Sequence, residues 1–116
     1  MRRAILRDIP GKKVHDLNEL AVKNDDEISL GRDNGNVIRI GEGFSDEKAT
    51  ETRLATISRN HATITYSDIE KFCIRDHSTN GTRINKTAIK SEADFLRSGD
   101  EIFFGAYGPF IYEEII

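Results

Sequence analysis

Short apolar runs separated by turn residues most strongly limit what this chain can fold into. In several runs apolar and polar residues alternate, as Ile28 and Leu30 do within 27–32, and the pattern recurs at 61–67. Such alternation turns one side of a segment toward a core and the other toward solvent, which is typical of a half-buried β-strand. Long apolar stripes at helical spacing do not occur. The pattern therefore predicts an all-β protein.

The expected strands follow one another along the chain. We expect an opening hairpin made of a strand at 3–9, a turn at 10–13 and a returning segment at 14–22. Further strands are expected at 27–32, 37–40, 61–67, 72–76, 82–84, 101–105 and 109–115. Many short strands with turn chemistry between them favour an antiparallel sandwich. The segment 41–56 is charged and poor in apolar residues, so we expect a long surface loop there.

Length and composition limit the possible classes of protein. With 116 residues the chain is interpreted as a single domain over 1–116, and its 37% hydrophobic and 32% charged residues are typical of a globular protein. The formal net charge of -3 argues against a nucleic-acid or anionic-membrane surface, which would carry a basic footprint. Arg7 interrupts the first apolar run, so we expect neither a secretory leader nor a membrane span. We expect a cytoplasmic monomer.

The single cysteine, Cys73, cannot form an internal disulfide. It lies in the alternating run 71–75, so we expect a buried structural thiol in a reducing environment. Cys73 and the histidines His15, His61 and His77 do not show the spacing of metal ligands. We therefore expect no metal and no cofactor.

Polar residues suited to an anion lie in three segments, each at the edge of an expected strand. The segments are Gly31–Arg32, Ser58–His61 and Ser78–Thr82, the last followed by Asn85. They supply two guanidiniums, a hydroxyl, and a carboxamide beside a tight glycine turn. Charged and hydroxyl donors of this kind bind phosphate oxygens well. The set predicts a site that holds a phosphate rather than one that breaks a bond.

A catalytic interpretation of these residues has less support. Ser58, His61 and either Asp76 or Asp100 could in principle be a nucleophile, a base and an acid. A hydrolase serine, however, lies on a strained, glycine-flanked elbow or beside an oxyanion loop, whereas Ser58 is flanked by an isoleucine and an arginine. We therefore expect no catalytic residue and no enzyme.

Four motifs, in order, resemble the forkhead-associated (FHA) domain. They are Ile28-Ser29-Leu30-Gly31-Arg32, Ile57-Ser58-Arg59-Asn60-His61-Ala62, Asp76-His77-Ser78-Thr79-Asn80-Gly81-Thr82-Arg83-Ile84-Asn85 and Ser98-Gly99-Asp100-Glu101-Ile102-Phe103-Phe104-Gly105. Each motif alone is short, but their order and approximate spacing match over most of the chain. The resemblance implies an eleven-stranded antiparallel β-sandwich of the FHA/SMAD-like type, whose loops at one end bind phosphothreonine peptides.

The resemblance also implies roles for individual residues. The residues expected to contact the phosphopeptide are Arg32, Ser58, Arg59, Thr79 and Asn80. The residues expected to support the site are Gly31, His61, Gly81 and Asn85. Gly31 lacks a Cβ, so the backbone can turn or pack closely there. Asn80 and Gly81 predict a tight turn with positive φ, and the Asn80 carboxamide is expected to hydrogen-bond the main chain of the peptide.

The expected function is therefore a phosphothreonine-dependent binding module, an adaptor in Ser/Thr kinase signalling whose partner is a phosphorylated protein. The alternative is a phosphate-independent interaction or scaffold domain on the same sandwich. The combination of Arg32, Ser58, Arg59 and Asn80 favours the first, because a domain without phosphate recognition would not need all four. Titration with a phosphorylated peptide and its unmodified twin separates the two.

Overall fold

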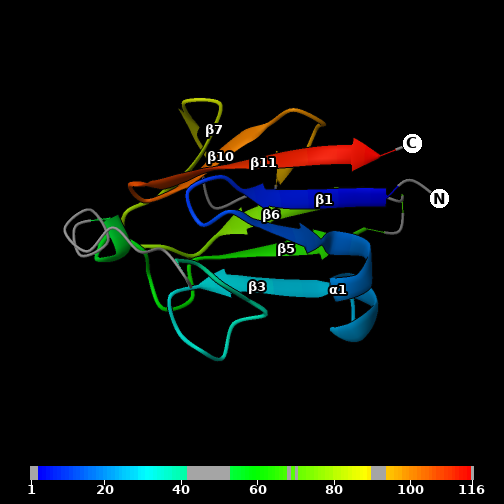
Figure 1. The fold of residues 1–116 in the computed structure, drawn as a ribbon, viewed down its shortest axis with the longest axis horizontal. Coiled ribbons are helices and arrows are strands. Elements are labelled where there is room, and N and C mark those ends of the chain that lie inside the picture. The colour runs from blue at the N-terminus through cyan, green and yellow to red at the C-terminus, as the bar shows by residue number, and fades with distance from the viewer. Residues whose placement is uncertain (1–2, 42–52, 68, 70, 90–93, 116) are drawn as a thin grey trace.

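Two β-sheets lie face to face with a hydrophobic core between them (Figure 1). The computed structural model describes residues 3–41, 53–67, 69, 71–89 and 94–115. One sheet has the order β2-β1-β11-β10-β7-β8, with β1 (Arg3–Asp8), β2 (Lys13–Asp16), β7 (Thr82–Ile84), β8 (Thr87–Ala88), β10 (Glu101–Phe104) and β11 (Tyr107–Ile115). The other has the order β4-β3-β5-β6-β9, with β3 (Glu27–Gly31), β4 (Ile38–Arg39), β5 (Ala62–Tyr66), β6 (Phe72–Asp76) and β9 (Asp94–Phe95).

The predicted all-β sandwich is confirmed, with two corrections to its detail. Strand pairing is antiparallel within the described residues except between β3 and β4, which run parallel. The returning segment expected at 14–22 is wrong from residue 17 onward, because the chain leaves β2 at Asp16 and forms the helix α1 (Leu17–Lys23). The short strands β8 and β9 were not expected, since two-residue strands carry too little sequence pattern to be recognised.

Local chemistry explains the helix. The Asp16 side chain accepts a hydrogen bond from the Glu19 N–H at 3.1 Å and so caps the first turn. Leu17 and Ala21, four residues apart, are buried on one side, while Lys23 donates to Glu19 at 2.8 Å on the other. Asp16 followed three residues later by Glu19 is the sequence signal for this helix start. Helix α1 is too short to cross a bilayer, and no other described helix can do so.

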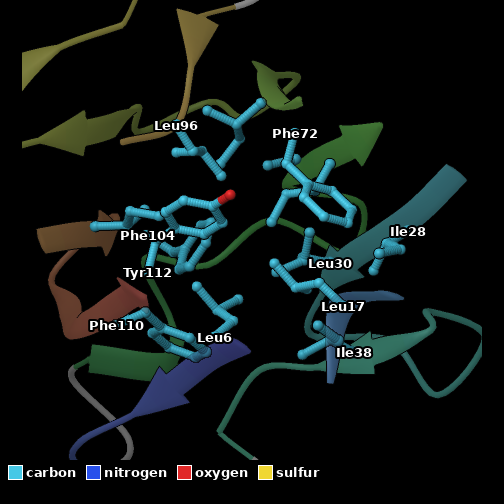
Figure 2. Close-up of a cluster of buried hydrophobic side chains, with 14 of the residues drawn as sticks. Leu6, Leu17, Ile28, Leu30, Ile38, Phe72, Leu96, Phe104, Phe110 and Tyr112 are labelled. Carbon is cyan, nitrogen blue, oxygen red and sulfur yellow. The ribbon is translucent and has the colours of Figure 1, made fainter. Parts of the chain in front are cut away.

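The core is built by strict alternation along paired strands. On β3, Ile28 and Leu30 are fully buried, and the strand registers place Ile28 beside Ile64 of β5 and Ile64 beside Ile74 of β6. Aromatic and aliphatic side chains of the other sheet, with Phe110 among them, meet this layer from the opposite side (Figure 2). Full burial of one such side chain stabilises the fold by about 1.5–3 kcal/mol.

Cys73 departs from its expected place. It points away from the core on β6 and is half-buried, with its Sγ atom 3.0 Å from Thr65 Oγ1. The alternation of β6 explains this position, because the neighbouring Phe72 and Ile74 are the residues that face the core. The thiol belongs to the outer face of the sheet rather than to the core.

The expected loop at 41–56 lies partly outside the described residues, which resume at 53. Residues 53–57 form a turn in which the Thr56 N–H donates to the Arg53 carbonyl and the Ile57 N–H donates to the Leu54 carbonyl. Leu54 packs against the core, and Ile57 is fully buried. The C-terminal part of this segment is therefore anchored to the sandwich. It lies at the end of the molecule opposite the two labelled termini (Figure 1).

A buried polar pair joins β1 to the start of β11. The Tyr107 hydroxyl lies 3.1 Å and 3.2 Å from the two oxygens of Asp8, and the Gly11 N–H donates to the same carboxylate at 2.8 Å. Burial raises the pKa of the Asp8 carboxyl above its ordinary value. The ionised group therefore depends on these donors for its stability.

Replacing Tyr107 by Phe removes one of these donors from a buried carboxylate. We expect the free energy of unfolding to fall by about 1–3 kcal/mol. Tyr112→Phe is the control, because its hydroxyl reaches the half-exposed Glu114, which water can solvate after the change. Urea unfolding of the parent and both variants measures the difference. Equal losses in the two variants would contradict the role given to Asp8.

Candidate functional site

A surface cleft of about 660 Å³ lies where the segments after β3, before β5 and after β6 meet. Its lining residues are Arg32, Ala55, Ile57, Ser58, Arg59, Asn60, His77, Thr79 and Asn80. The structure thus brings together all five residues expected to contact a phosphopeptide. Four further lining residues were not expected to contact a peptide: Ile57, Asn60 and His77, which lie within the quoted motifs but were given no role, and Ala55, which lies outside them.

Backbone hydrogen bonds hold the end of β3 against the segment that carries Ser58. The Arg32 N–H donates to the Ser58 carbonyl at 3.1 Å, and the Asp33 N–H donates to the Arg59 carbonyl at 3.3 Å. Within β3 itself, the Leu30 carbonyl accepts a hydrogen bond from the His61 N–H at 2.8 Å. These bonds place two arginines at neighbouring positions on facing segments.

The Gly31 position is determined by a close backbone approach rather than by a positive φ. A Cβ atom at Gly31 would overlap the carbonyl oxygen of Arg59. The same oxygen accepts a 2.6 Å hydrogen bond from Asn36 Nδ2, which also donates to the Asp33 carbonyl at 3.0 Å. Asn36 is only 8% exposed. It was missed by the sequence analysis, although the turn-forming run Asp33-Asn34-Gly35-Asn36 was a usable signal.

His61 connects two of the three segments from inside the protein. It is fully buried, its Nδ1 atom accepts a hydrogen bond from the Ser58 N–H at 3.0 Å, and its Nε2 atom lies 3.0 Å from the Gly81 carbonyl. Because Nδ1 accepts, the proton of the neutral ring is on Nε2 and is donated to Gly81. Burial lowers the pKa of the imidazole, against smaller opposing effects of the Gly81 carbonyl and Asp76. The neutral ring is the form that fits.

The segment after β6 is folded around one carboxylate oxygen. Asp76 Oδ1 accepts hydrogen bonds from the Ser78 hydroxyl at 2.6 Å and from the buried Thr82 hydroxyl at 2.8 Å. The Ser78 oxygen in turn accepts from the Gly81 N–H at 2.7 Å, and Gly81 has a φ of +92°. The turn predicted at Asn80 and Gly81 is therefore present. Asp76 and Ser78 are supporting residues that the sequence analysis did not assign.

Two side chains of the cleft, Ser58 and Asn80, each form one hydrogen bond with the backbone of a neighbouring segment. Ser58 Oγ accepts a hydrogen bond from the Thr79 N–H at 3.1 Å, which leaves its own proton to donate. Asn80 Nδ2 donates to the Thr56 carbonyl at 3.0 Å, which leaves Oδ1 and the second amide hydrogen. Thr56 itself is held by bonds to Arg53 and Ala106. Both side chains are thus oriented and still have hydrogen-bonding capacity.

Asn85 lies in a different place from the rest of the expected set. Its side chain donates to Asp100 and accepts from the Glu101 N–H, each at 2.9 Å. Its φ of +50° belongs to the turn between β7 and β8. Asn85 therefore fixes that turn to the start of β10 and does not line the cleft.

Among the described residues, no ion pair neutralises the positive charge of the cleft. Arg32 and Arg59 are exposed, and neither forms an ion pair with any other described residue. Guanidinium groups offer several donors in a fixed plane that suits phosphate or carboxylate oxygens. No group of three or more His, Cys, Asp or Glu side chains within the described ranges could hold a metal ion. The arrangement is suited to binding an anion.

Comparison with known proteins gives the family. The FHA domain family model matches residues 28–105, more than half of the chain, so the chain belongs to the FHA domain family. This confirms the resemblance found in the sequence. A search of curated protein sequences gave no match.

Solved structures with this fold include several FHA domains. The solution structure of the FHA domain of an Arabidopsis thaliana hypothetical protein has a TM-score of 0.75 and 25% identity, and the match covers 100% of this chain and 88% of that one. The N-terminal FHA domain of S. cerevisiae Rad53p, in complex with a phosphothreonine peptide, has a TM-score of 0.73 and 18% identity, with 96% and 92% covered. Mycobacterium tuberculosis EmbR, in complex with a low affinity phosphopeptide, has a TM-score of 0.68 and 23% identity; 96% of this chain matches 24% of that one.

Gly31→Ala tests the close approach to Arg59. We expect a loss of about 1–3 kcal/mol in the free energy of unfolding, because the added methyl group must displace the backbone that presents Arg59. Gly35→Ala is the matched control, since a Cβ there would meet no atom within 4 Å and its φ is not in the left-handed region. Urea unfolding compares them. A Gly31→Ala protein as stable as Gly35→Ala would refute this account of the glycine.

The lowered pKa of His61 predicts a pH dependence of stability. The unfolded chain binds a proton at His61 more readily than the folded chain does. The stability contributed by the neutral ring is therefore fully present above about pH 6.5 and is lost progressively as the pH falls below that value toward the folded pKa. Unfolding free energies from urea titrations between about pH 7.5 and about pH 5.5 should show this decline.

Two histidine variants assign the decline to a residue. His77→Gln, a change at an exposed ring, should keep the pH dependence of the parent. His61→Ala should flatten it and should also lower stability by about 1–3 kcal/mol at neutral pH, because the Ser58 N–H and Gly81 carbonyl lose their buried partner. An unchanged slope in His61→Ala would contradict the assignment.

Proposed function

We propose that this chain is a phosphothreonine-dependent peptide-binding module that acts as an adaptor in Ser/Thr kinase signalling. The proposal rests on the position of Arg32, Ser58 and Arg59, which line one open cleft. Backbone hydrogen bonds and the buried His61 side chain hold their segments in place. These side chains offer several donors to a ligand, namely two guanidiniums and the Ser58 hydroxyl proton, which the hydrogen bond from Thr79 leaves available. A phosphate carries about -1.5 to -2 charges at neutral pH and three acceptor oxygens, so it complements such a set.

The neighbouring residues suit an extended peptide that carries the phosphate. Asn80, which rims the same cleft, keeps both a donor and an acceptor after its bond to Thr56. A peptide backbone needs both at once, so Asn80 is proposed to bind the main chain, with Thr79 beside it. Ala55 and Ile57 bring apolar atoms to the lining. They offer a surface for the extra methyl group that distinguishes phosphothreonine from phosphoserine.

Relatives with this fold support the same assignment. The structures of Rad53p and EmbR were determined with phosphopeptides bound. A further neighbour comes from a structural and functional analysis of phosphothreonine-dependent FHA domain interactions. The identities of 18–23% carry the fold, so the binding role of this chain rests on its own cleft. We propose that this module has no catalytic activity and that it is located in the cytoplasm. Both statements are predictions.

The alternative is an interaction domain that uses the same cleft without phosphate. An exposed carboxylate ligand could also pair with Arg32 or Arg59. A carboxylate has a single charge and two coplanar oxygens, whereas the cleft presents donors from three separate segments. The tetrahedral phosphate therefore satisfies more of them, which is why phosphate dependence is the preferred proposal.

Four peptides that differ at one position test the proposal: threonine, phosphothreonine, phosphoserine and glutamate. Calorimetric titration should give binding in the order phosphothreonine, phosphoserine, then glutamate, with negligible binding of threonine. Burial of the threonine methyl contributes on the order of 0.8 kcal/mol to the first difference. Arg32→Ala should lower the affinity by about 1.5–3 kcal/mol through loss of a charge-assisted contact.

Two further variants serve as comparisons in the same titration. Ser58→Ala should weaken phosphopeptide binding with little effect on folding, since the Ser58 hydroxyl is half-exposed. Arg97→Ala removes an exposed arginine outside the cleft and should bind like the parent. Equal binding of threonine and phosphothreonine peptides, or parental affinity in Arg32→Ala, would overturn the proposed function.

A further inference from the structure

A second groove of about 330 Å³ lies on the outer face of the sheet formed by β3, β5 and β6. Its lining residues are Glu27, Thr63, Thr65, Cys73, Arg75 and His77. They alternate along their strands with the core residues Ile28, Ile64 and Ile74, so they point to the opposite side of the sheet. We refer to this feature as the sheet-face groove.

His77 joins the sheet-face groove to the phosphopeptide cleft. Its side chain is exposed and lines both cavities. Its Nε2 atom lies 3.0 Å from Thr63 Oγ1, so the ring is tied to the floor of the groove. A peptide that leaves the cleft across His77 therefore reaches the groove without crossing another element. The two cavities can act as one continuous surface.

Two opposite charges lie in successive rows of the sheet-face groove. Arg75 is directly opposite Thr63, in the row next to His77. In the following row Thr65 is opposite Glu27 on one side and Cys73 on the other. Arg75 and Glu27 are thus two strands and one row apart, roughly 12 Å between their Cα atoms by ordinary sheet spacing. Neither side chain forms an ion pair or hydrogen bond with another described residue.

We propose that the sheet-face groove is an extension of the phosphopeptide site and binds residues that flank the phosphothreonine, with an acidic peptide side chain paired with Arg75. This inference rests on the proposed function. It is carried by continuity through His77 and by the guanidinium of Arg75, which has no ion-pair partner in the part of the chain that the structure describes. Arg75 is two residues from His77, or about 7 Å along the strand, so an extended peptide brings a residue about two to four positions from the phosphothreonine beside it.

The two rows of the sheet-face groove differ in charge, because one contains Arg75 and the other contains Glu27. Arg75 is the charge that a peptide meets first after His77, and Glu27 lies one row farther from the cleft. An acidic side chain near the phosphothreonine is therefore favoured, while one placed farther along meets Glu27 and is disfavoured. The preference for an acidic residue should depend on its distance from the phosphothreonine and not on the total charge of the peptide.

Matched phosphopeptides test the extension. Each contains one phosphothreonine and either Asp or Asn at one position about two to four residues away, in one series before it and in another after it. Fluorescence anisotropy with the full chain should show that Asp binds roughly two- to five-fold tighter than Asn in one series, as expected for one exposed ion pair. Unphosphorylated versions of the peptides are measured in parallel.

Three variants locate the effect. Arg75→Gln should abolish the difference between Asp and Asn while keeping the preference for phosphothreonine over threonine. Arg97→Gln, an exposed arginine outside both cavities, should retain the difference, and Glu27→Gln should keep or enlarge it. Equal binding of Asp and Asn peptides in both series, or a difference that persists in Arg75→Gln, overturns the extension and leaves the cleft intact. Failure of every phosphopeptide to bind the parent overturns the proposed function and the extension together.

Discussion

The buried imidazole of His61 is the interaction on which the shape of the cleft depends. It accepts a hydrogen bond from the backbone of the Ser58 segment and donates one to the backbone of the Gly81 turn. Its ring also packs edge-on against Phe104, at 5.5 Å between centroids. A single side chain therefore connects two loops to each other and to the hydrophobic core. Because both of its partners are main-chain groups, His61 positions the loops whichever side chains they carry outward.

The other supports repeat this arrangement of backbone held by buried polar atoms. Asn36 and the absence of a side chain at Gly31 hold the Arg59 carbonyl, and Asp76 gathers the hydroxyls of Ser78 and Thr82. The side chains at the surface of the cleft consequently form few or no hydrogen bonds that support the fold. Stability and recognition thus rest on different atoms of the same short segments.

Much of this organisation could be predicted from the sequence, because strand alternation and motif order are local patterns. Alternation predicted β3, β5, β6 and β7 closely, and the five residues that the motifs predicted as peptide contacts all line the cleft. Helix α1 was missed because its apolar face has only two buried residues, Leu17 and Ala21. The turn-forming residues around Asn36 mark its bond to Asp33, but its bond to the Arg59 carbonyl was missed because that partner lies 23 residues away. Asn85 sits on a turn that the motif alone could not place.

The buried hydrogen bonds that join the loops of the cleft affect the kinetics and the entropy of peptide binding. Loops that are already fixed by buried bonds lose little conformational freedom when a ligand arrives, so the entropy lost on binding falls mainly on the peptide. Association then needs little rearrangement of these loops, and peptides that differ in sequence should differ chiefly in how long they stay bound. A receptor of this kind binds a newly phosphorylated partner without first ordering its own loops.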